Sequence, residues 1–505
     1  MVGVLIDTVS IQNYIFSSNK LIENVGASYL VEQIYEEYLK DALRTFHSTS
    51  PNLDTWKNNP SYMNFSPYGI GYIGGGNALI LFEVNNGKHK EFIKNFTNIL
   101  LEKTPGLRTS FGINPNFNLN NSANSFTNSM KEIHKNLKKN KNIYFPIITL
   151  PKYGITADCP FSGESAEIYY KDKWISNVSK VKIEAGEKSL SHIQDMLKDE
   201  LGETYTFTNE IDKLGQVEHK NYIAVVHIDG NNMGKRFEKC NTLKELRNLS
   251  IRVKENTQKA FKETIEDLVG LIENRILGPK NNFHFHTDGN GKTILPIRPI
   301  IIGGDDITFV CDGRLGVYLA EKFITKFSEQ QIKGEKLSAC AGVSIVKTKY
   351  PFYRAYQLSE QLCENAKKES RKEENSSYLD FLISSRGFSG TLEEIRERSF
   401  KIPYGLLPFG PYRIDNNTQE NSIYHLKGGI KFFNNWTRTK IEQLREVTTK
   451  SESEIKMFVK EMDIKGYTFY EIPYAPPYSE DIRVNDKTPY FDIIELMDFY
   501  PKELL

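Results

Sequence analysis

The sequence predicts an α+β protein built around two copies of one β-α-β-β-α-β unit. The same order of apolar strands and polar helices occurs twice, and each copy places a glycine-rich hairpin after a strand that ends on an acid. The spacings agree: 67 positions separate Asp7 from Gly74 in the first copy, and 74 separate Asp229 from Gly303 in the second. A later strand glycine follows the hairpin by 38 and 39 positions. Chance similarity of two α/β segments is the alternative to duplication.

The first copy starts with an apolar strand ending at Asp7, and a helical stretch over 11–38 follows it. Two apolar arms around glycines at 71–82 predict a hairpin. A strand at 109–113 and a polar helix over 124–139 complete this unit.

The second copy repeats this order with a more acidic hairpin. Its strand 223–229 precedes a long stretch of helical apolar spacing, and residues 299–310 form the hairpin around Gly-Gly-Asp-Asp. A strand at 339–343 and a helix over 352–368 end the unit. These elements predict four domains: 1–149 for the first copy, 150–215 for a linker, 216–385 for the second copy and 386–505 for a C-terminal domain. The linker is turn-rich, with a short helix near 191–201. The C-terminal domain starts with a connector, which helices over 428–465 follow.

Composition narrows the class of protein. The chain has 505 residues, with 65 Lys and Arg against 64 Asp and Glu, so its net charge of +1 argues against a surface coated in basic charge. A local basic groove stays possible. No apolar run approaches the roughly 18 residues of a membrane helix, and the N-terminus does not resemble a signal peptide. Five scattered cysteines without a CxxC pair favour a reduced, cytoplasmic protein.

Three acids form the candidate catalytic and metal-binding group. Asp229 ends a buried strand, and Asp305 and Asp306 lie at the hairpin tip. If these strands are neighbours, the carboxylates converge, and such a cluster is unfavourable without cations. Two Mg²⁺ ions about 4 Å apart stabilise attacking and leaving oxygens, which is the chemistry of nucleotidyl transfer. Gly303 and Gly304 allow the tight turn and a close approach of nucleotide. An ordinary surface turn is the alternative.

A second group predicts triphosphate binding. The turn after the first acid feeds a helix expected near Lys235, whose N-terminus offers free N–H groups to phosphates. Lys367, at the end of the last helix, is placed to reach a terminal phosphate, although a helix-end lysine often serves only the helix dipole. The residues of the turn are Gly230, Asn231, Asn232, Met233 and Gly234.

The first copy keeps Asp7 but carries Gly76-Asn77 where the second has two acids. A neutral tip holds catalytic Mg²⁺ poorly, so we interpret this copy as a non-catalytic partner that holds the acceptor nucleotide. Cys159 has no second cysteine nearby to form a zinc site, and His284 and His286 favour an ordinary surface pair.

These motifs resemble the large, polymerase-like subunit of type III CRISPR effector complexes, which pairs two palm domains and makes cyclic oligoadenylates. The residues that carry the resemblance over 1–385 are Ile11–Phe16, Lys20-Leu21, Gly26-Ala27-Ser28, Asp229–Gly234, Pro296–Pro299 and Gly303–Asp306. The resemblance implies two ferredoxin-like palm domains, a linker domain and a helical C-terminal domain. It also implies nucleotide binding by Gly26, Ala27 and Ser28.

The chain departs from this family in two ways. The first palm starts at residue 1 and no His-Asp dipeptide occurs, so cleavage of DNA by an HD nuclease domain is not expected. The family's zinc cysteines are reduced to Cys159, which argues against a zinc-stabilised linker.

We therefore expect a cytoplasmic, Mg²⁺- or Mn²⁺-dependent nucleotidyltransferase that converts ATP into a cyclic oligoadenylate or a related adenylyl product. The resemblance implies other effector subunits, guide RNA and target RNA as partners, and no membrane. Two alternatives stay open: a non-catalytic RNA-binding scaffold of the complex, and a stand-alone cyclic (di)nucleotide synthase, which includes the GGDEF type. A homo-oligomer belongs to the stand-alone alternative.

Overall fold

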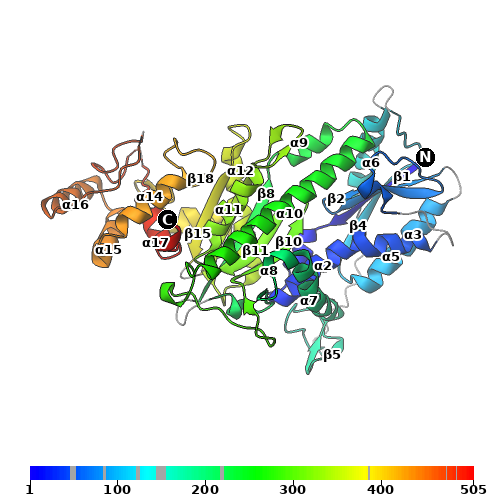
Figure 1. The fold of residues 1–505 in the computed structure, drawn as a ribbon, viewed down its shortest axis with the longest axis horizontal. Helices are drawn as coiled ribbons and strands as arrows, with labels where there is room; N and C mark the ends of the chain where they lie inside the picture. Colours follow the sequence, from blue (N-terminus) through cyan, green and yellow to red (C-terminus); the bar gives the residue numbers. More distant parts are fainter. Residues whose placement is uncertain are drawn as a thin grey trace. The chain divides into compact units, whose positions relative to one another are not determined.

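The computed structural model describes the chain except residues 46–52, 84–86, 121–124, 144–154, 216–220, 385–386, 474 and 485 (Figure 1). The chain divides into two compact units. Unit 1 comprises Met1–Met196, Asn232–Thr257 and Ile300–Asp305, and unit 2 comprises Leu197–Asn231, Gln258–Pro299 and Asp306–Leu505. The expected domain boundaries near 150, 216 and 385 fall in or beside segments outside the described residues.

Unit 1 contains a four-stranded antiparallel sheet in the order β2-β3-β1-β4. Alternate residues of β1, such as Val4 and Ile6, are fully buried and pack against Phe92 and Phe96 of α5. One face of the strand, where every second residue lies, therefore packs against one face of the helix, where every fourth residue lies. The strands are β1 (Val2–Val9), β2 (Tyr68–Gly74), β3 (Asn77–Phe82) and β4 (Arg108–Asn114). The helices of this repeat are α1 (Ile11–Ile15), α2 (Leu21–Gln33), a π-helical turn (Ile34–Tyr38), α3 (Leu39–Arg44), α4 (Thr55–Asn58), α5 (Lys88–Lys103) and α6 (Ser125–Lys141).

The linker segment differs from its prediction. Instead of a short helix near 191–201, α7 runs over Asn177–Met196 and crosses α2, followed by the short α8 (Lys198–Leu201). The crossing is close because Gly26 and Gly186 face each other's helix; a Cβ on Gly26 would lie 1.8 Å from the Lys182 carbonyl oxygen. The buried face of α7 includes Ser179, Lys182 and Gly186. Because none of these residues is a large apolar one, the sequence lacks the helical repeat of apolar residues that would have predicted the full length of α7.

The second repeat forms a six-stranded sheet in the order β10-β11-β8-β14-β15-β18. Its first four strands have the same order as β2-β3-β1-β4, and β8 runs antiparallel to both neighbours, as β1 does. The predicted duplication and fold class are therefore confirmed. The sequence did not predict β15, which is parallel to β14, or β18. The strands are β8 (Tyr222–Gly230), β10 (Ile297–Gly303), β11 (Asp306–Asp312), β14 (Ala339–Lys347), β15 (Tyr378–Ser384) and β18 (Tyr412–Arg413).

Helices α11 (Gly316–Ser328) and α12 (Phe352–Ser370) cover opposite faces of this sheet. Successive strand residues point to opposite faces: Gly342 lies against α12, whereas Val343 lies against Gly316 of α11. A Cβ on Gly342 would lie only 1.9 Å from the Ser359 carbonyl oxygen, so glycine is required for this packing. In unit 1, Gly112 plays the same part under α6.

The C-terminal part of unit 2 is helical around an aromatic core. Phe433 is fully buried and its ring contacts Trp436 and Tyr490, so these aromatic residues pack in the core of this part. Helices here are α13 (Leu392–Ser399), α14 (Ile423–Phe433), α15 (Arg438–Val447), α16 (Glu452–Ile464) and α17 (Tyr490–Met497). The remaining elements are β5 (Ile168–Tyr170), β6 (Lys173–Ile175), β7 (Tyr205–Thr206), α9 (Met233–Glu238), α10 (Leu243–Glu273), β9 (Thr293–Ile294), β12 (Gln331–Ile332), β13 (Glu335–Lys336), β16 (Lys401–Ile402) and β17 (Gly405–Leu406).

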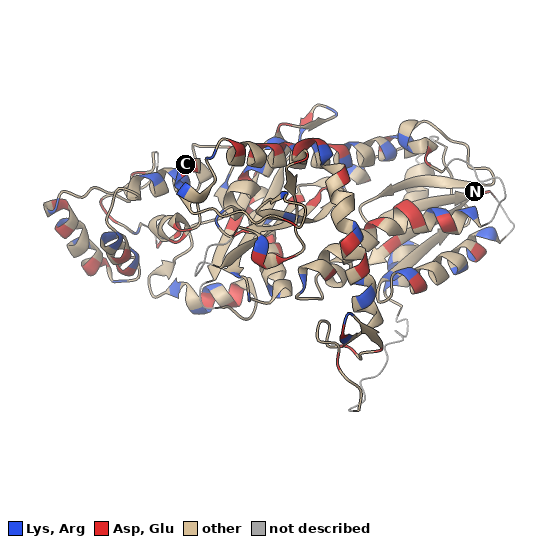
Figure 2. Cartoon of the chain, turned by 60° about the horizontal axis from the view of Figure 1, so that its bottom comes forward, with Lys and Arg blue, Asp and Glu red and all other residues tan. Residues whose placement is uncertain are grey.

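Surface chemistry agrees with the balanced composition. Both signs of charge are interspersed along the helices (Figure 2), in keeping with a net charge of +1. All five cysteines are free thiols and are buried. Among the described helices, none combines the length and apolar character that crossing a membrane requires.

Candidate active site

Two carboxylates of unit 2 are brought together by strand register. Asp306, the first residue of β11, lies directly opposite Asp229 near the end of β8. Both side chains are partly open to solvent, with 25% of Asp306 and 34% of Asp229 exposed. Asp305 precedes Asp306 as the second residue of the two-residue turn that joins β10 to β11, and Gly304 is the first. The convergence predicted from neighbouring strands is therefore found for Asp229 and Asp306.

Lys367 neutralises the first of these acids. It lies in the last turn of α12, and its ammonium group forms an ion pair with the Asp229 carboxylate. The lysine side chain is only 17% exposed, so the ion pair is partly shielded from water. Gly342 lets α12 approach the sheet closely enough for this contact. Lys367, which the sequence suggested as a ligand for a terminal phosphate, thus lies at the acid pair, a contact that the sequence did not predict.

His227 was not predicted as part of the site. It lies in β8 two residues before Asp229, and its Nδ1 is 3.1 Å from the Thr308 hydroxyl and 3.3 Å from an Asp306 carboxylate oxygen. Burial lowers the pKa of His227, which favours the neutral imidazole. Burial, and then the charge of Asp306, raise the pKa of Tyr356, whose ring contacts His227. No sequence motif identifies His227 as a site residue. The only signal is its position on the same face of β8 as Asp229.

The predicted phosphate turn follows Asp229 directly, and its helix, α9, begins at Met233 rather than at Lys235. Asn232 is exposed and has a positive φ of 59°, and Gly234 is also exposed. Met233 is buried, with 4% of its surface exposed. The open part of the turn is therefore at Asn232 and Gly234.

Asn231 has a different position from the rest of this turn. Its side-chain amide is buried and donates to the Ser338 hydroxyl (3.1 Å), the Ser370 hydroxyl (3.0 Å) and the Ser376 carbonyl (3.0 Å). Its main-chain N–H donates to the Ser338 carbonyl. These bonds commit the Asn231 amide to holding the turn in place.

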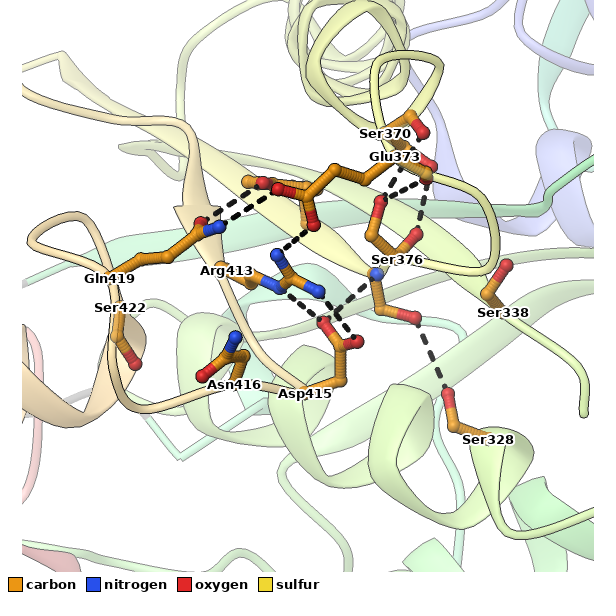
Figure 3. Close-up of polar contacts among 12 residues, drawn as sticks. Ser328, Ser338, Ser370, Glu373, Ser376, Arg413, Asp415, Asn416, Gln419 and Ser422 are labelled. Atoms are coloured by element: carbon orange, nitrogen blue, oxygen red, sulfur yellow. Dashed lines mark hydrogen bonds and ion pairs between the residues drawn. The ribbon is translucent and has the colours of Figure 1, made fainter.

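The serines around Asn231 belong to a larger polar network (Figure 3). The Ser376 hydroxyl donates to the carbonyls of Ser370 and Glu373, at 3.2 and 2.8 Å. Arg413 of β18 joins Glu373 to Asp415 by ion pairs and is only 10% exposed. The C-terminal strand β18 is thereby connected to the loop that supports the turn after Asp229.

The first repeat has a matching but less acidic arrangement. In unit 1, Asp7 lies opposite Asn77 in the register of β1 and β3, as Asp229 lies opposite Asp306. Lys141, at the end of α6, forms an ion pair with Asp7, as Lys367 does with Asp229. The neutral tip expected from Gly76-Asn77 is therefore confirmed, and Lys141 was missed.

The segment Gly26-Ala27-Ser28 lies within α2. Gly26 and Ala27 are buried, and Gly26 packs against α7. Their surroundings give these two residues a packing role; Ser28 is only partly buried.

The residue types suit a hard divalent cation. Within the described part of the chain, no three His, Cys, Asp or Glu side chains group closely enough to hold a metal alone. Mg²⁺, however, is commonly held by one or two carboxylates together with substrate phosphates, and Asp229 and Asp306 offer such a pair beside an open turn. His284 and His286 are both exposed, as expected for a surface pair.

Fold and site together define a palm-domain protein with a tandem repeat. Residues 222–376 match the family model described as Cas10/Cmr2, second palm domain. This segment is therefore similar to a Cas10/Cmr2 second palm domain, and it covers less than a third of the chain. No curated protein sequence matches the chain.

Solved structures of similar fold cover nearly the whole chain. A Csm1–Csm4 cassette in complex with pppApApA is 14% identical with a TM-score of 0.51, and the match covers 99% of this chain and 69% of that one. The apo cassette has 13% identity, the same TM-score and the same coverages. The cassette with AMPPNP has 13% identity and a TM-score of 0.50, covering 100% of this chain and 70% of that one. At these identities the matches show a shared fold.

Proposed function

We propose that the chain is a divalent-metal-dependent nucleotidyltransferase that joins adenylyl groups from ATP into a cyclic oligoadenylate or a related product. The single observation that carries this proposal is the opposition of Asp229 and Asp306 at the end of a Cas10/Cmr2 second palm domain. Solved structures of the same fold hold AMPPNP or pppApApA, which supports ATP as substrate.

In this proposal Asp229, Asp305 and Asp306 hold Mg²⁺ or Mn²⁺. The metal supplies charge neutralisation for the attacking 3′-hydroxyl and for the leaving pyrophosphate. Asp229 and Asp306 orient it from adjacent strands, and Lys367 adds a positive charge beside Asp229 for the triphosphate. His227, whose Nδ1 is 3.1 Å from the Thr308 hydroxyl, lies 3.3 Å from an Asp306 carboxylate oxygen and flanks the acid pair.

In this proposal the residues of the turn after Asp229 have two different roles. Asn232 and Gly234 present their open backbone to the phosphates, while Asn231 and Met233 hold the turn on the protein. Gly303 and Gly304 keep the hairpin tip narrow, which allows a nucleotide to approach the main chain.

The first repeat is proposed to bind the acceptor nucleotide without catalysing transfer. Its Asp7–Lys141 ion pair keeps the charge pattern of the second repeat, but Asn77 replaces the second acid. A site with one carboxylate already paired to lysine binds Mg²⁺ weakly, so this repeat contributes binding.

The competing function is a scaffold that binds RNA and other effector subunits. The solved relatives are cassettes of Csm1 with Csm4, which supports effector subunits as partners of this chain too. We favour the enzyme because the acid pair, its lysine and the open turn are all present.

The direct test is incubation of the purified chain, alone and with its co-purifying subunits, with each nucleoside triphosphate and Mg²⁺ or Mn²⁺. Mass spectrometry of the products identifies base and ring size. Formation of adenylate oligomers supports the proposal; intact ATP under all conditions, including with target RNA added, contradicts it.

A further inference from the structure

One face of α10 binds main-chain carbonyls of both glycine hairpins. The donors Arg247, Ser250 and Thr257 and the carbonyls that accept from them all belong to unit 1. Arg247 is fully buried and donates to the carbonyls of Ile70 and Gly71 in β2, and also to those of Pro60 and Tyr62. One turn further along, the Ser250 hydroxyl donates to the Ile73 carbonyl at 3.0 Å, next to the first hairpin tip.

Thr257 continues this row to the acidic hairpin. Its side chain is 1% exposed, and its hydroxyl donates to the Gly304 carbonyl at 2.6 Å. A buried threonine in a helix usually donates back to its own helix, as Thr264 of α10 does to the Ala260 carbonyl at 2.7 Å. Thr257 instead reaches out to the peptide bond that joins Gly304 to Asp305.

The two hairpin tips use different turns. In the first repeat, both turn residues have positive φ, 58° for Gly75 and 74° for Gly76, as in a type I′ turn. In the second, Gly304 has a φ of 58° but the φ of Asp305 is not positive, as in a type II′ turn. The two types differ by a flip of the central peptide, which here is the Gly304–Asp305 peptide.

The hydrogen bond from Thr257 therefore acts on the group whose orientation separates the two turns. At the first tip, the corresponding Gly75 carbonyl accepts from the side chain of Asn77, at 3.4 Å. At the second tip, Asp306 takes the place of Asn77 and has no amide to donate, so the donor comes from α10. The acidic tip thus depends on a hydroxyl outside the motif.

We propose that Thr257 is a positioning residue: its hydroxyl holds the Gly304–Asp305 peptide in the type II′ orientation and thereby fixes the backbone from which Asp305 and Asp306 project toward a divalent metal. The metal-binding part of this inference rests on the proposed function. The effect on the hairpin itself does not.

The test compares the wild-type chain with Thr257→Val, which keeps the shape but removes the hydroxyl, and Thr257→Ser, which restores it. Thr264→Val is the matched control, because it removes a buried hydroxyl of the same helix that bonds only within that helix. The double variant Asp305→Asn/Asp306→Asn is the reference for a chain whose site does not bind metal. Hydrogen–deuterium exchange of peptides containing residues 303–307 reports the hairpin, and electron paramagnetic resonance of free Mn²⁺ reports metal affinity.

In Thr257→Val we expect faster exchange at the hairpin and about three- to tenfold weaker Mn²⁺ binding, the effect of losing one hydrogen bond. Thr257→Ser and Thr264→Val should match the wild-type chain in both readouts. Saturating Mn²⁺ should restore most of the turnover of Thr257→Val, because the acids themselves are intact.

Unchanged exchange at the hairpin in Thr257→Val overturns the inference, and so does faster exchange with unchanged Mn²⁺ affinity. An equal effect in Thr264→Val would show general loosening of α10 and would also overturn it. If the wild-type chain binds Mn²⁺ no better than the double Asn variant, the proposed function fails, and the exchange data alone decide whether Thr257 holds the turn.

Discussion

Asp306 lies opposite Asp229 in the register of two adjacent antiparallel strands, so two carboxylates open to water face the same end of the second palm sheet. In the first repeat the same register places Asn77 opposite Asp7. At this paired position the two repeats therefore differ in side-chain charge, with Asn77 in the first and Asp306 in the second.

Replacing both tip acids, Asp305→Asn with Asp306→Asn, should reduce ATP conversion at least about 100-fold, because the metal's charge stabilisation is worth several kcal/mol. The fold should survive, since the change also relieves repulsion between Asp306 and Asp229. Mass spectrometry of products and thermal unfolding measure the two effects. Asp267→Asn, a change at an exposed acid of α10, is the control and should leave conversion unchanged. Product formed at wild-type rate by the double variant would remove these acids from the site.

Removing the lysine partner should make stability depend on metal. In Lys367→Gln the Asp229 carboxylate loses its ion pair and faces Asp306 alone, at a cost of about 1–2 kcal/mol. Added Mg²⁺ should recover that loss, and the KM for ATP should rise. Thermal unfolding with and without Mg²⁺ measures the first effect, and initial rates measure the second.

Lys368→Gln is the control for this prediction. Lys368 is 56% exposed and its nearest acid, Glu393, is 90% exposed, so the change should alter neither readout. Equal stabilisation of wild type and Lys367→Gln by Mg²⁺ would argue against a metal beside Asp229.

Periodicity and spacing predicted the duplicated strands and the acid pair, because strand ends and hairpin tips leave a clear local pattern. The helix-end position of Lys367 suggested a phosphate ligand, but its ion pair with Asp229 was not predicted. Lys141 escaped the same reasoning. It lies 29 positions after Gly112, whereas Lys367 lies 25 after Gly342, so the two lysines are offset by about one helical turn. Spacing alone does not align them, although their ion pairs are equivalent.

The glycine under α12 should be intolerant of any side chain. In Gly342→Ala the new methyl group would lie 1.9 Å from the Ser359 carbonyl oxygen, so α12 must move away from the sheet. We expect a loss of at least ~2 kcal/mol in the free energy of unfolding, together with loss of activity as Lys367 is displaced.

Denaturant unfolding checks this expectation against Gly270→Ala. Gly270 lies in α10 with no atom within 4 Å of an added Cβ, so alanine should leave stability unchanged or raise it by up to ~1 kcal/mol. A Gly342→Ala variant as stable as the wild-type chain would contradict the packing described here.

A buried carboxyl far from the acid pair should give a pH-dependent stability. Burial raises the pKa of Asp492 to about 6, although Tyr412 and the N–H groups of Phe409 and Gly410 donate to it. Because the folded pKa lies above the unfolded value of 3.8, the folded chain binds the proton more tightly between these values. Stability from this group therefore increases as pH falls from about 6 toward 4, by about 1 kcal/mol per pH unit.

Asp492→Asn should remove this contribution. The difference in unfolding free energy between wild type and variant should grow in favour of the wild type on going from pH 7 to pH 5. Asp498→Asn, which changes a 48% exposed carboxylate just beyond the same helix, is the control. A difference that is constant with pH would show that Asp492 titrates normally.

The contacts made by Arg247, Ser250 and Thr257 could not be predicted from sequence. Each of these side chains donates to a main-chain carbonyl and not to another side chain. The sequence therefore contains no pair of matching residue types from which the contact could be predicted. Asn231 illustrates the same limit: its place in a Gly/Asn turn suggested phosphate binding, whereas its amide is bound to serines from three separate segments.

Arg247 also has a consequence for the order of synthesis. Unit 1 ends its first segment at Met196, yet it needs Asn232–Thr257 and Ile300–Asp305 to be complete. A ribosome adding about 5–20 residues per second needs roughly 5–20 s to travel from residue 196 to 305. Within that interval, the five carbonyls of the first segment that Arg247 and Ser250 bind await these donors until residue 250 has been made. Unit 1, most of which lies in the amino-terminal half of the chain, is therefore complete only after translation has passed the middle of the chain.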